Sequence, residues 1–147
     1  MVTIDQIKQL REETSISIQE CKKALQEAKG DFKIAKEILK KWGKDLAGSK
    51  TVRKTSQGII ESYIHPNKKI GVLLELNCET DFVAKSKDFQ TLSHELCLQI
   101  AAMNDTPSLL SQPWIKDMTK TVKDLVDEYI AKVGENIVVK RFIKYEI

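Results

Sequence analysis

Apolar residues recur at helical spacing through roughly the first forty residues of the chain. Three stretches each place an apolar stripe on one face: Ile4, Ile7 and Leu10; Cys21, Ala24, Leu25 and Ala28; and Ile34, Ala35, Ile38, Leu39 and Trp42. The residues that signal helix ends are Thr3 with Gln6, Ser17 with Glu20, Gly30, and Asp31. Short amphipathic helices with tight connections can bury their stripes only against one another, so we predict a three-helix domain over residues 1–42.

The apolar period is lost over residues 43–57, GKDLAGSKTVRKTSQ. This stretch gains glycine, serine, threonine and lysine, which are typical of connecting segments. We therefore predict a basic linker here, with one helical turn at most, between the three-helix domain and a second domain over residues 58–147.

A β-hairpin is predicted at the start of the second domain. The apolar, β-branched runs GIIESYIH and IGVLLELN are separated by the turn-forming sequence PNKK. The helical period returns from Asp88, and a second helix is predicted after Pro113, ending at Gly134.

The chain closes with NIVVKRFIKYEI, which predicts a third strand. Strict alternation would place Val138 and Phe142 on one face of this strand and Val139 and Ile143 on the other. The order β-β-α-α-β predicts an α+β fold, in which two helices cover a three-stranded, mainly antiparallel sheet.

The composition allows a packed core, because 41% of the 147 residues are apolar and 31% are charged. The net charge of +3 is unevenly distributed: residues 1–56 carry 13 Lys and Arg against 8 Asp and Glu, and residues 57–147 carry 11 against 13. The basic excess lies mainly in residues 36–54. It favours an acidic partner, either a nucleic acid or a protein surface, without choosing between them.

The sequence predicts a cytoplasmic protein. No apolar stretch is long enough to span a membrane, and the first residues, MVTIDQIKQLREE, do not have the pattern of a signal peptide. The three cysteines, Cys21, Cys78 and Cys97, are odd in number and follow no disulfide spacing, which favours a reducing compartment.

No catalytic motif survives inspection. The stretch GKDLAGSKT lacks the order of a phosphate-binding loop and follows a helix rather than a strand. Ser93 and His94 are adjacent on a helix and point about 100° apart, so they cannot act as nucleophile and base. Cys78, Glu79 and Asp81 have no fourth zinc ligand near them in the sequence. We expect no enzyme activity, no metal and no cofactor.

One unusual segment remains, NCETDFVAKS at residues 77–86, which places Phe82 and Val83 in a polar stretch. Phe82 could fold back to fill the junction between hairpin and helix, as apolar loop residues usually do. Alternatively, Phe82 could project as an anchor for a partner, with Asp81 fixing the loop or competing for a cation. Composition alone favours the first interpretation.

Three separated blocks resemble the translation elongation factor Ts family. LREETSISIQECKKALQEAKGDFKIAKEILKKWG resembles the family's N-terminal domain, NCETDFVAKSKDF its central signature, and AKVGENIVVKRFIKYEI its closing strand. The blocks follow the family's order and cover nearly the whole chain, which is identified as a member. The resemblance implies guanine-nucleotide exchange on elongation factor Tu, in both its GDP-bound and nucleotide-free forms, without chemistry of the chain's own.

The resemblance also implies two regions that contact elongation factor Tu. On the N-terminal domain, the implied contacts with a helix of the partner's nucleotide-binding domain are Arg11, Ile18, Gln19 and Lys22. In the central signature, Asp81 and Phe82, flanked by Thr80 and Val83, would intrude near the partner's magnesium and phosphate site. Gly134, Glu135 and Asn136 match the family's GEN turn, for which the resemblance implies a structural role.

The chain departs from the family pattern in several places. Ser15 and Ser17 stand where glycines are usual, and Ile18-Gln19 replace a pair of methionines. The long helical segment that the family carries between Met103 and Leu109 shrinks to NDTPS, and a second core subdomain is absent. Because a single small sheet leaves edge strands free to pair, we predict a homodimer.

The main alternative is a small nucleic-acid-binding module that uses the basic run at 36–54. The aromatic residues Trp42, Tyr63, Phe82 and Tyr145 do not interleave with this run, as a base-stacking platform would require. We therefore expect no direct contact with nucleic acid.

Overall fold

The computed structural model describes residues 2–103 and 108–147. It begins with the three predicted helices, α1 (Ile4–Thr14), α2 (Ile18–Glu27) and α3 (Phe32–Lys50). Each helix starts at its predicted cap: Thr3 and Gln6 form a capping box, and Ser17 and Asp31 accept backbone N–H groups of α2 and α3. The buried core of this unit contains Ile7, Leu10, Cys21, Ala24, Leu25, Ala28, Ala35 and Leu39. Ile4 and Ile34, predicted to share the apolar stripes, are exposed instead.

Helix α3 corrects the predicted linker, because it continues without a break to Lys50. Its second half packs on α6 (Val122–Val133) through small residues, because a Cβ at Gly43 would lie 3.3 Å from that of Ala131. Ala47 is buried in the core that the rest of the chain forms, which we call the second core. Lys44 forms an ion pair with Asp124 of α6 at 3.2 Å. The non-helical connection is confined to residues 51–56. The division into two domains remains a prediction.

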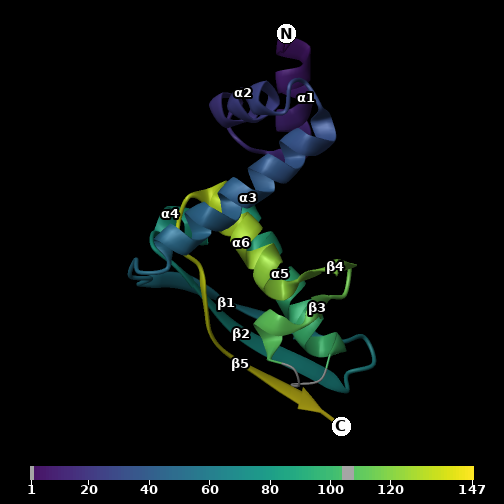
Figure 1. Cartoon of the computed structure of the whole chain (residues 1–147). Helices are drawn as coiled ribbons and strands as arrows, with labels where there is room; N and C mark the ends of the chain where they lie inside the picture. Colours follow the sequence, from purple (N-terminus) through teal and green to yellow (C-terminus); the bar gives the residue numbers. More distant parts are fainter. Residues whose placement is uncertain (1, 104–107) are drawn as a thin grey trace.

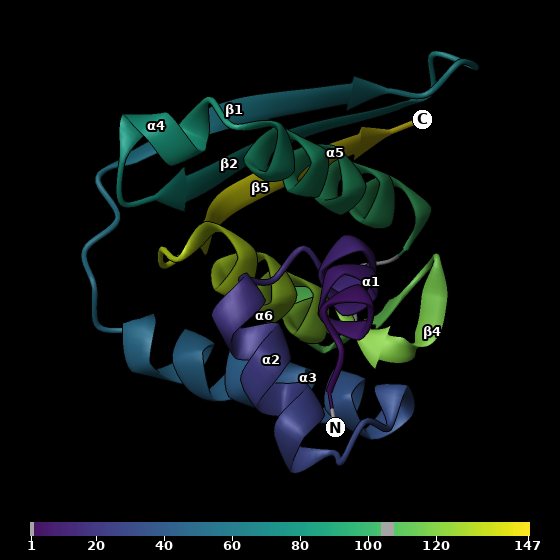
Figure 2. The ribbon, with the colours of Figure 1, turned by 90° about the horizontal axis from the view of Figure 1, so that it is seen from above.

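The predicted sheet is confirmed. Its strands are β1 (Gln57–Ile64), β2 (Ile70–Cys78) and β5 (Val138–Glu146), in the order β1-β2-β5, with antiparallel neighbours. The inner face of β2 buries Val72, Leu74, Leu76 and Cys78. Helix α5 (Lys87–Ala102) packs on β1 and β2, and α6 (Val122–Val133) packs between α5 and α3. Figures 1 and 2 show the resulting layers, with the sheet and α3 on opposite sides of α5 and α6.

A bulge in β5 corrects the predicted alternation. Arg141 pairs with Glu75, but Val139 pairs with the next residue of β2, Leu76, so Lys140 is the extra residue. One additional residue reverses the alternation beyond it. Val139 and Phe142 therefore share the inner face, opposite Leu76 and Leu74, whereas Val138 and Ile143 share the outer face, opposite Asn77 and Leu73.

The connection between α5 and α6 contains structure that the sequence did not predict. A 3-10 turn, η1 (Leu109–Ser111), precedes a small hairpin of β3 (Pro113–Trp114) and β4 (Asp117–Thr121). The buried Gln99 of α5 holds this hairpin, accepting the N–H of Ile115 at 2.9 Å and donating to the carbonyl of Pro113 at 3.0 Å. The predicted second helix follows this hairpin and begins at Val122.

The remaining element, α4 (Asp81–Ala84), is a single turn between β2 and α5. Gly134 ends α6 in the left-handed conformation, with φ of 76°, as predicted. In the part of the chain that the structure describes, no helix is both long enough and apolar enough to cross a membrane.

Candidate partner-binding site

The chain turns twice within a few residues at the end of β2. Thr80 caps α4, with its hydroxyl accepting the N–H of Val83 at 3.4 Å. Ser86 caps α5, accepting the N–H of Phe89 at 3.2 Å, and donates to the carbonyl of Val83 at 2.7 Å. Two helix caps so close together fix the course of the loop.

Phe82 projects from this loop into solvent, where its side chain is 89% exposed. Val83 packs partly against the second core, and Ala84 is 2% exposed. These two residues, not Phe82, fill the junction between hairpin and helix. The interpretation that composition favoured is therefore wrong, and the geometry is that of a projecting anchor. We call residues 80–83 the tip.

Asp81, at the start of α4, pairs with Lys85 one turn later at 2.8 Å. The hydrogen bond from Lys85 to Asp81, and then the charge of Asp81, raise the pKa of Lys85 above its ordinary value. Both side chains are well exposed, so the pair holds the loop only weakly and leaves Asp81 accessible to a partner.

The tip is braced from a distant part of the sequence. Oε1 of Glu135 accepts the N–H groups of Glu79 (3.2 Å) and Thr80 (2.9 Å), and Oε2 accepts the hydroxyl of Thr80 at 2.7 Å. In return, Oε2 of Glu79 accepts the N–H of Asn136 at 2.6 Å. Arg53 lies 3.6 Å from Oε1 of Glu79, and its carbonyl accepts the Asn136 side chain at 3.0 Å.

The thiol of Cys78 completes the support beneath the tip by donating to the carbonyl of Thr80 at 3.2 Å. Burial, and then the negative charge of Glu135, raise the pKa of Cys78 to about 11. The group is therefore a protonated donor at neutral pH. Among residues 2–103 and 108–147, no three His, Cys, Asp or Glu side chains are placed to hold a metal ion.

The other predicted contacts lie on the first two helices. Arg11 of α1 and Ile18, Gln19 and Lys22 at the start of α2 are all exposed. We call these four residues the foot. Between Arg11 and Ile18, Ser15 ends α1 in the left-handed conformation, with φ of 60°, at a position where the family usually has glycine. The foot and the tip do not meet, and α2 and α4 lie apart in both views (Figures 1 and 2).

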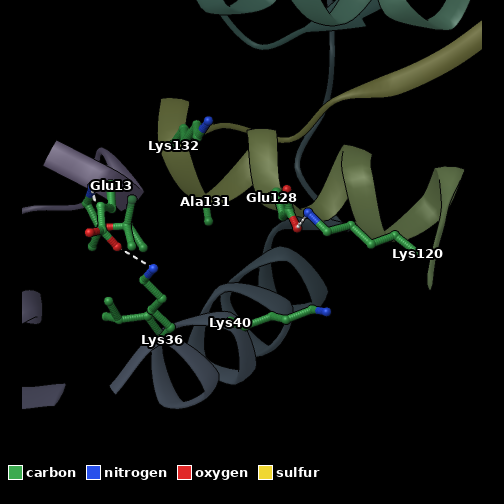
Figure 3. Close-up of a pocket in the computed structure, with 10 residues that line it drawn as sticks. Glu13, Lys36, Lys40, Lys120, Glu128, Ala131 and Lys132 are labelled. Carbon is green, nitrogen blue, oxygen red and sulfur yellow. Dashed lines mark hydrogen bonds and ion pairs between the residues drawn. The ribbon is translucent and has the colours of Figure 1, made fainter. Parts of the chain in front are cut away.

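A cleft of about 300 Å³ lies between the end of α1, the first half of α3 and α6, and is lined by several lysines (Figure 3). Lys36 pairs with Glu13, and Lys120 pairs with Glu128 at 2.8 Å. Lys40 and Lys132 extend in different directions (Figure 3). These lysines do not converge on one point, so the cleft does not have the geometry of an anion site.

The basic run at 36–54 does not form one continuous surface either. Lys36 and Lys44 are paired with carboxylates of neighbouring elements, and Lys50 is buried. Trp42 packs partly against the first core instead of offering a stacking surface. The arrangement gives no support to the nucleic-acid alternative.

An exposed aromatic residue held on a braced turn is typical of a surface that binds another protein. Comparison with known proteins names the family. The family model described as Elongation factor TS matches residues 79–147. Similar proteins named Elongation factor Ts come from Moorella thermoacetica (39% identity over 100% of this chain and 96% of the relative), Coprothermobacter proteolyticus (40%, 96% and 95%) and Thermotoga maritima (42%, 99% and 96%).

The chain belongs to the elongation factor Ts family. As a member of that family, it is a guanine-nucleotide exchange factor for elongation factor Tu and not an enzyme. The match to the Moorella relative spans 194 aligned positions, about 47 more than the 147 residues of this chain. The sequence places a shortening at NDTPS, of which residues 104–107 lie outside the described residues.

Proposed function

We propose that this chain speeds GDP release from elongation factor Tu by inserting its tip beside the partner's magnesium and phosphate site. In this proposal Phe82 is the wedge, Asp81 acts on the magnesium environment, and Thr80 and Val83 shape the turn that carries them. The observation that carries the proposal is the 89% exposure of Phe82 on a braced turn. Covering an exposed apolar side chain with a partner's surface lowers the free energy, which favours binding.

The tip need not supply the whole free energy of nucleotide binding. A nanomolar nucleotide complex corresponds to about 12 kcal/mol, whereas burying one phenylalanine contributes about 1.5–3 kcal/mol. An exchange factor needs only a higher affinity for the nucleotide-free partner than for the occupied one. By linkage, GDP then weakens binding of the factor by the same ratio. In this proposal the chain therefore stabilises nucleotide-free elongation factor Tu until GTP binds.

The foot supplies the affinity that holds the wedge in place. Ile18 is 50% exposed, and Arg11, Gln19 and Lys22 surround it with polar groups, which suits a contact with a helix of the partner. Lys22 also raises the rate of encounter with an acidic surface. Helix α3 supports this division of roles, because its packing on α6 fixes the separation of foot and tip.

The same proposal includes a homodimer. The outer face of the sheet leaves Ile60, Leu73, Ile143 and Tyr145 exposed, and β1 and β5 have free edges. A second copy of this chain would cover that apolar face. Light scattering at micromolar concentration should give twice the mass of 16.7 kDa, and a monomer mass would contradict this part of the proposal.

The proposed setting is the cytoplasm, in agreement with three cysteines that form no disulfide.

The test is the release of a fluorescent GDP derivative from elongation factor Tu, with and without the chain. We expect clear acceleration by the intact chain and a loss of about 10–100-fold in that acceleration for Phe82→Ala. Met118→Ala is the matched control, because Met118 is also a large exposed apolar residue but lies on the β4 hairpin. No acceleration by the intact chain would contradict the exchange function, and an unimpaired Phe82→Ala would contradict the wedge.

A further inference from the structure

We propose that Glu135 is a positioning residue for exchange, whose carboxylate sets the direction in which Phe82 is presented to elongation factor Tu. This inference rests on the proposed role of Phe82. Glu135 does not touch the partner in this scheme. It acts through Thr80, to which it makes two hydrogen bonds. A third hydrogen bond joins Glu135 to the N–H of the neighbouring Glu79.

The turn that carries Phe82 cannot hold its own shape. Helix α4 contains four residues, and an isolated helical turn of that length is unstable because the first turn fixes several torsions for a single hydrogen bond. The Asp81–Lys85 pair is exposed and adds little. The conformation of the tip must therefore be imposed by contacts with the rest of the molecule.

Glu135 supplies that constraint through the side chain of Thr80. A threonine hydroxyl has one proton to donate, and here it goes to Oε2 of Glu135 at 2.7 Å. The oxygen is then oriented to accept the N–H of Val83, the residue after Phe82. Hydrogen bonds to a charged carboxylate are stronger than those between neutral groups. The chain of bonds thus runs from Glu135 through Thr80 to the peptide that follows Phe82.

The backbone of Thr80 is fixed as well. Its N–H donates to Oε1 of Glu135 at 2.9 Å, and its carbonyl accepts the thiol of Cys78 at 3.2 Å. That carbonyl also accepts the N–H of Ala84 at 3.2 Å. All the polar groups of Thr80 are therefore engaged, and Glu135 accepts two of its five hydrogen bonds. Replacing Glu135 therefore releases the cap without changing the chemical identity of Phe82 or its neighbours.

Glu135 is itself held in position by the turn that contains it. Gly134 ends α6 with φ of 76°, and Asn136, 4% exposed, donates its N–H to Glu79. The two segments thus exchange carboxylates, Glu135 to the loop and Glu79 to the turn. Arg53 lies beside Glu79 and offsets part of the paired negative charge. We call these contacts of Arg53, Glu79, Glu135 and Asn136 the brace. It joins the end of β2, the end of α6 and the connection that follows α3.

The experiment is a double-mutant cycle in the GDP-release assay, using Glu135→Ala, Phe82→Ala and both together. We expect Glu135→Ala to lower the maximal exchange rate about tenfold, while the concentration for half-maximal rate changes less than about twofold because the foot is intact. In the Phe82→Ala background, Glu135→Ala should have no further effect, because it acts only through Phe82. Glu135→Gln keeps one acceptor oxygen for the two N–H groups and should restore most of the rate.

Glu128→Ala is the matched control, since it removes a carboxylate of α6 that pairs with Lys120 away from the tip. Hydrogen exchange of the Thr80 and Val83 amides in the chain alone gives a readout independent of elongation factor Tu. We expect faster exchange of both amides in Glu135→Ala and no change in Glu128→Ala.

Three outcomes would overturn the inference. If intact chain accelerates GDP release and Glu135→Ala does so equally well, the positioning role fails while the exchange function stands. If Glu135→Ala lowers the rate as much in the Phe82→Ala background, Glu135 acts on the fold in general. If the intact chain has no exchange activity, the proposed function fails instead, and unchanged protection of Thr80 in Glu135→Ala would then show that the brace does not order the tip.

Discussion

The foot and the tip both expose side chains to solvent, but different forces hold them there. Ile18 and Lys22 stand one turn apart on α2, a regular helix whose buried side contains Cys21, Ala24 and Leu25. Phe82 stands on a single turn that depends on bonds from residues more than fifty positions away. A regular helix presents its exposed face through local geometry, whereas the tip needs the assembled fold. The direction of Phe82 is therefore the more sensitive of the two to distant substitutions.

The largest expected effect is on the alkylation rate of the Cys78 thiol, which is buried beneath the tip. Because burial raises the pKa of Cys78 from 9.0 to about 11, its thiolate fraction at pH 8 is about 100-fold lower than in the unfolded chain. Alkylation of Cys78 in the native chain should be slower by at least that factor, and the rate should rise about tenfold per pH unit. Peptide mapping after iodoacetamide treatment, with the urea-unfolded chain as reference, measures this. Equal rates in the two states would mean that the tip's base is open.

The Cys78 thiol also makes the free energy of unfolding depend on pH, so that it decreases as the pH rises above 9. The folded chain keeps the proton of Cys78 above pH 9, where the unfolded chain has lost it, so unfolding releases protons between pH 9 and 11. The contribution of this group is complete below pH 9 and is lost as the pH rises through 11. Cys78→Ser should flatten the decrease in unfolding free energy over this range. An unchanged pH profile in Cys78→Ser would contradict the buried, protonated thiol.

The next prediction concerns the helix that connects foot and tip. Gly43→Leu should lower the free energy of unfolding by about 1–3 kcal/mol, because α3 approaches Ala131 of α6 there. Gly48→Leu is the control, since its Cβ would meet no atom within 4 Å. It should leave stability unchanged or raise it by up to about 1 kcal/mol through helix propensity. Urea unfolding of both variants measures the difference, and equal effects would rule out close packing at Gly43.

A smaller effect is expected at the foot. Ile18→Ala removes a half-exposed side chain that we assign to the partner contact, so the concentration of chain for half-maximal exchange should rise about fivefold. The maximal rate should stay within about twofold, because the tip is untouched. Ile4→Ala, at an exposed position on the far end of α1, is the control. A fall in maximal rate for Ile18→Ala would erase the distinction between foot and tip.

The smallest effect is expected at Lys85, the exposed partner of Asp81. Lys85→Ala should leave the urea midpoint within error and change the maximal exchange rate less than about twofold. A large loss of rate would mean that the tip is held by this local pair rather than by Glu135.

Local signals in the sequence predicted the parts of the fold that local interactions stabilise. The caps at Thr3 and Asp31 and the left-handed Gly134 lie where the sequence placed them, because caps bond to residues a few positions away. The continuation of α3 was missed because residues 43–57 have the composition of a loop. Gly43 and Ala47 in this stretch are small because α3 packs closely on α6 there. The bulge at Lys140 and the hairpin held by Gln99 depend on partners distant in sequence.

The candidate site divides in the same way. The residues of the tip could be predicted as unusual, since NCETDFVAKS places apolar residues among polar ones. Their orientation could not, because it depends on Val83 and Ala84 filling the junction that Phe82 might have filled. Glu135 matched the family's GEN turn, but nothing in that turn indicated its hydrogen bonds to Thr80, 55 positions earlier. Alternation and helical period do not report contacts of that range.

The most direct test of the account is the affinity of the chain for elongation factor Tu in its nucleotide-free and GDP-bound forms, measured by titration for the natural chain and for Phe82→Ala. The natural chain should bind the nucleotide-free form more tightly, and Phe82→Ala should reduce that preference by about tenfold or more, which is at least 1.4 kcal/mol. Its affinity for the GDP-bound form should change less than about twofold. Equal affinity of the natural chain for the two forms would contradict the account.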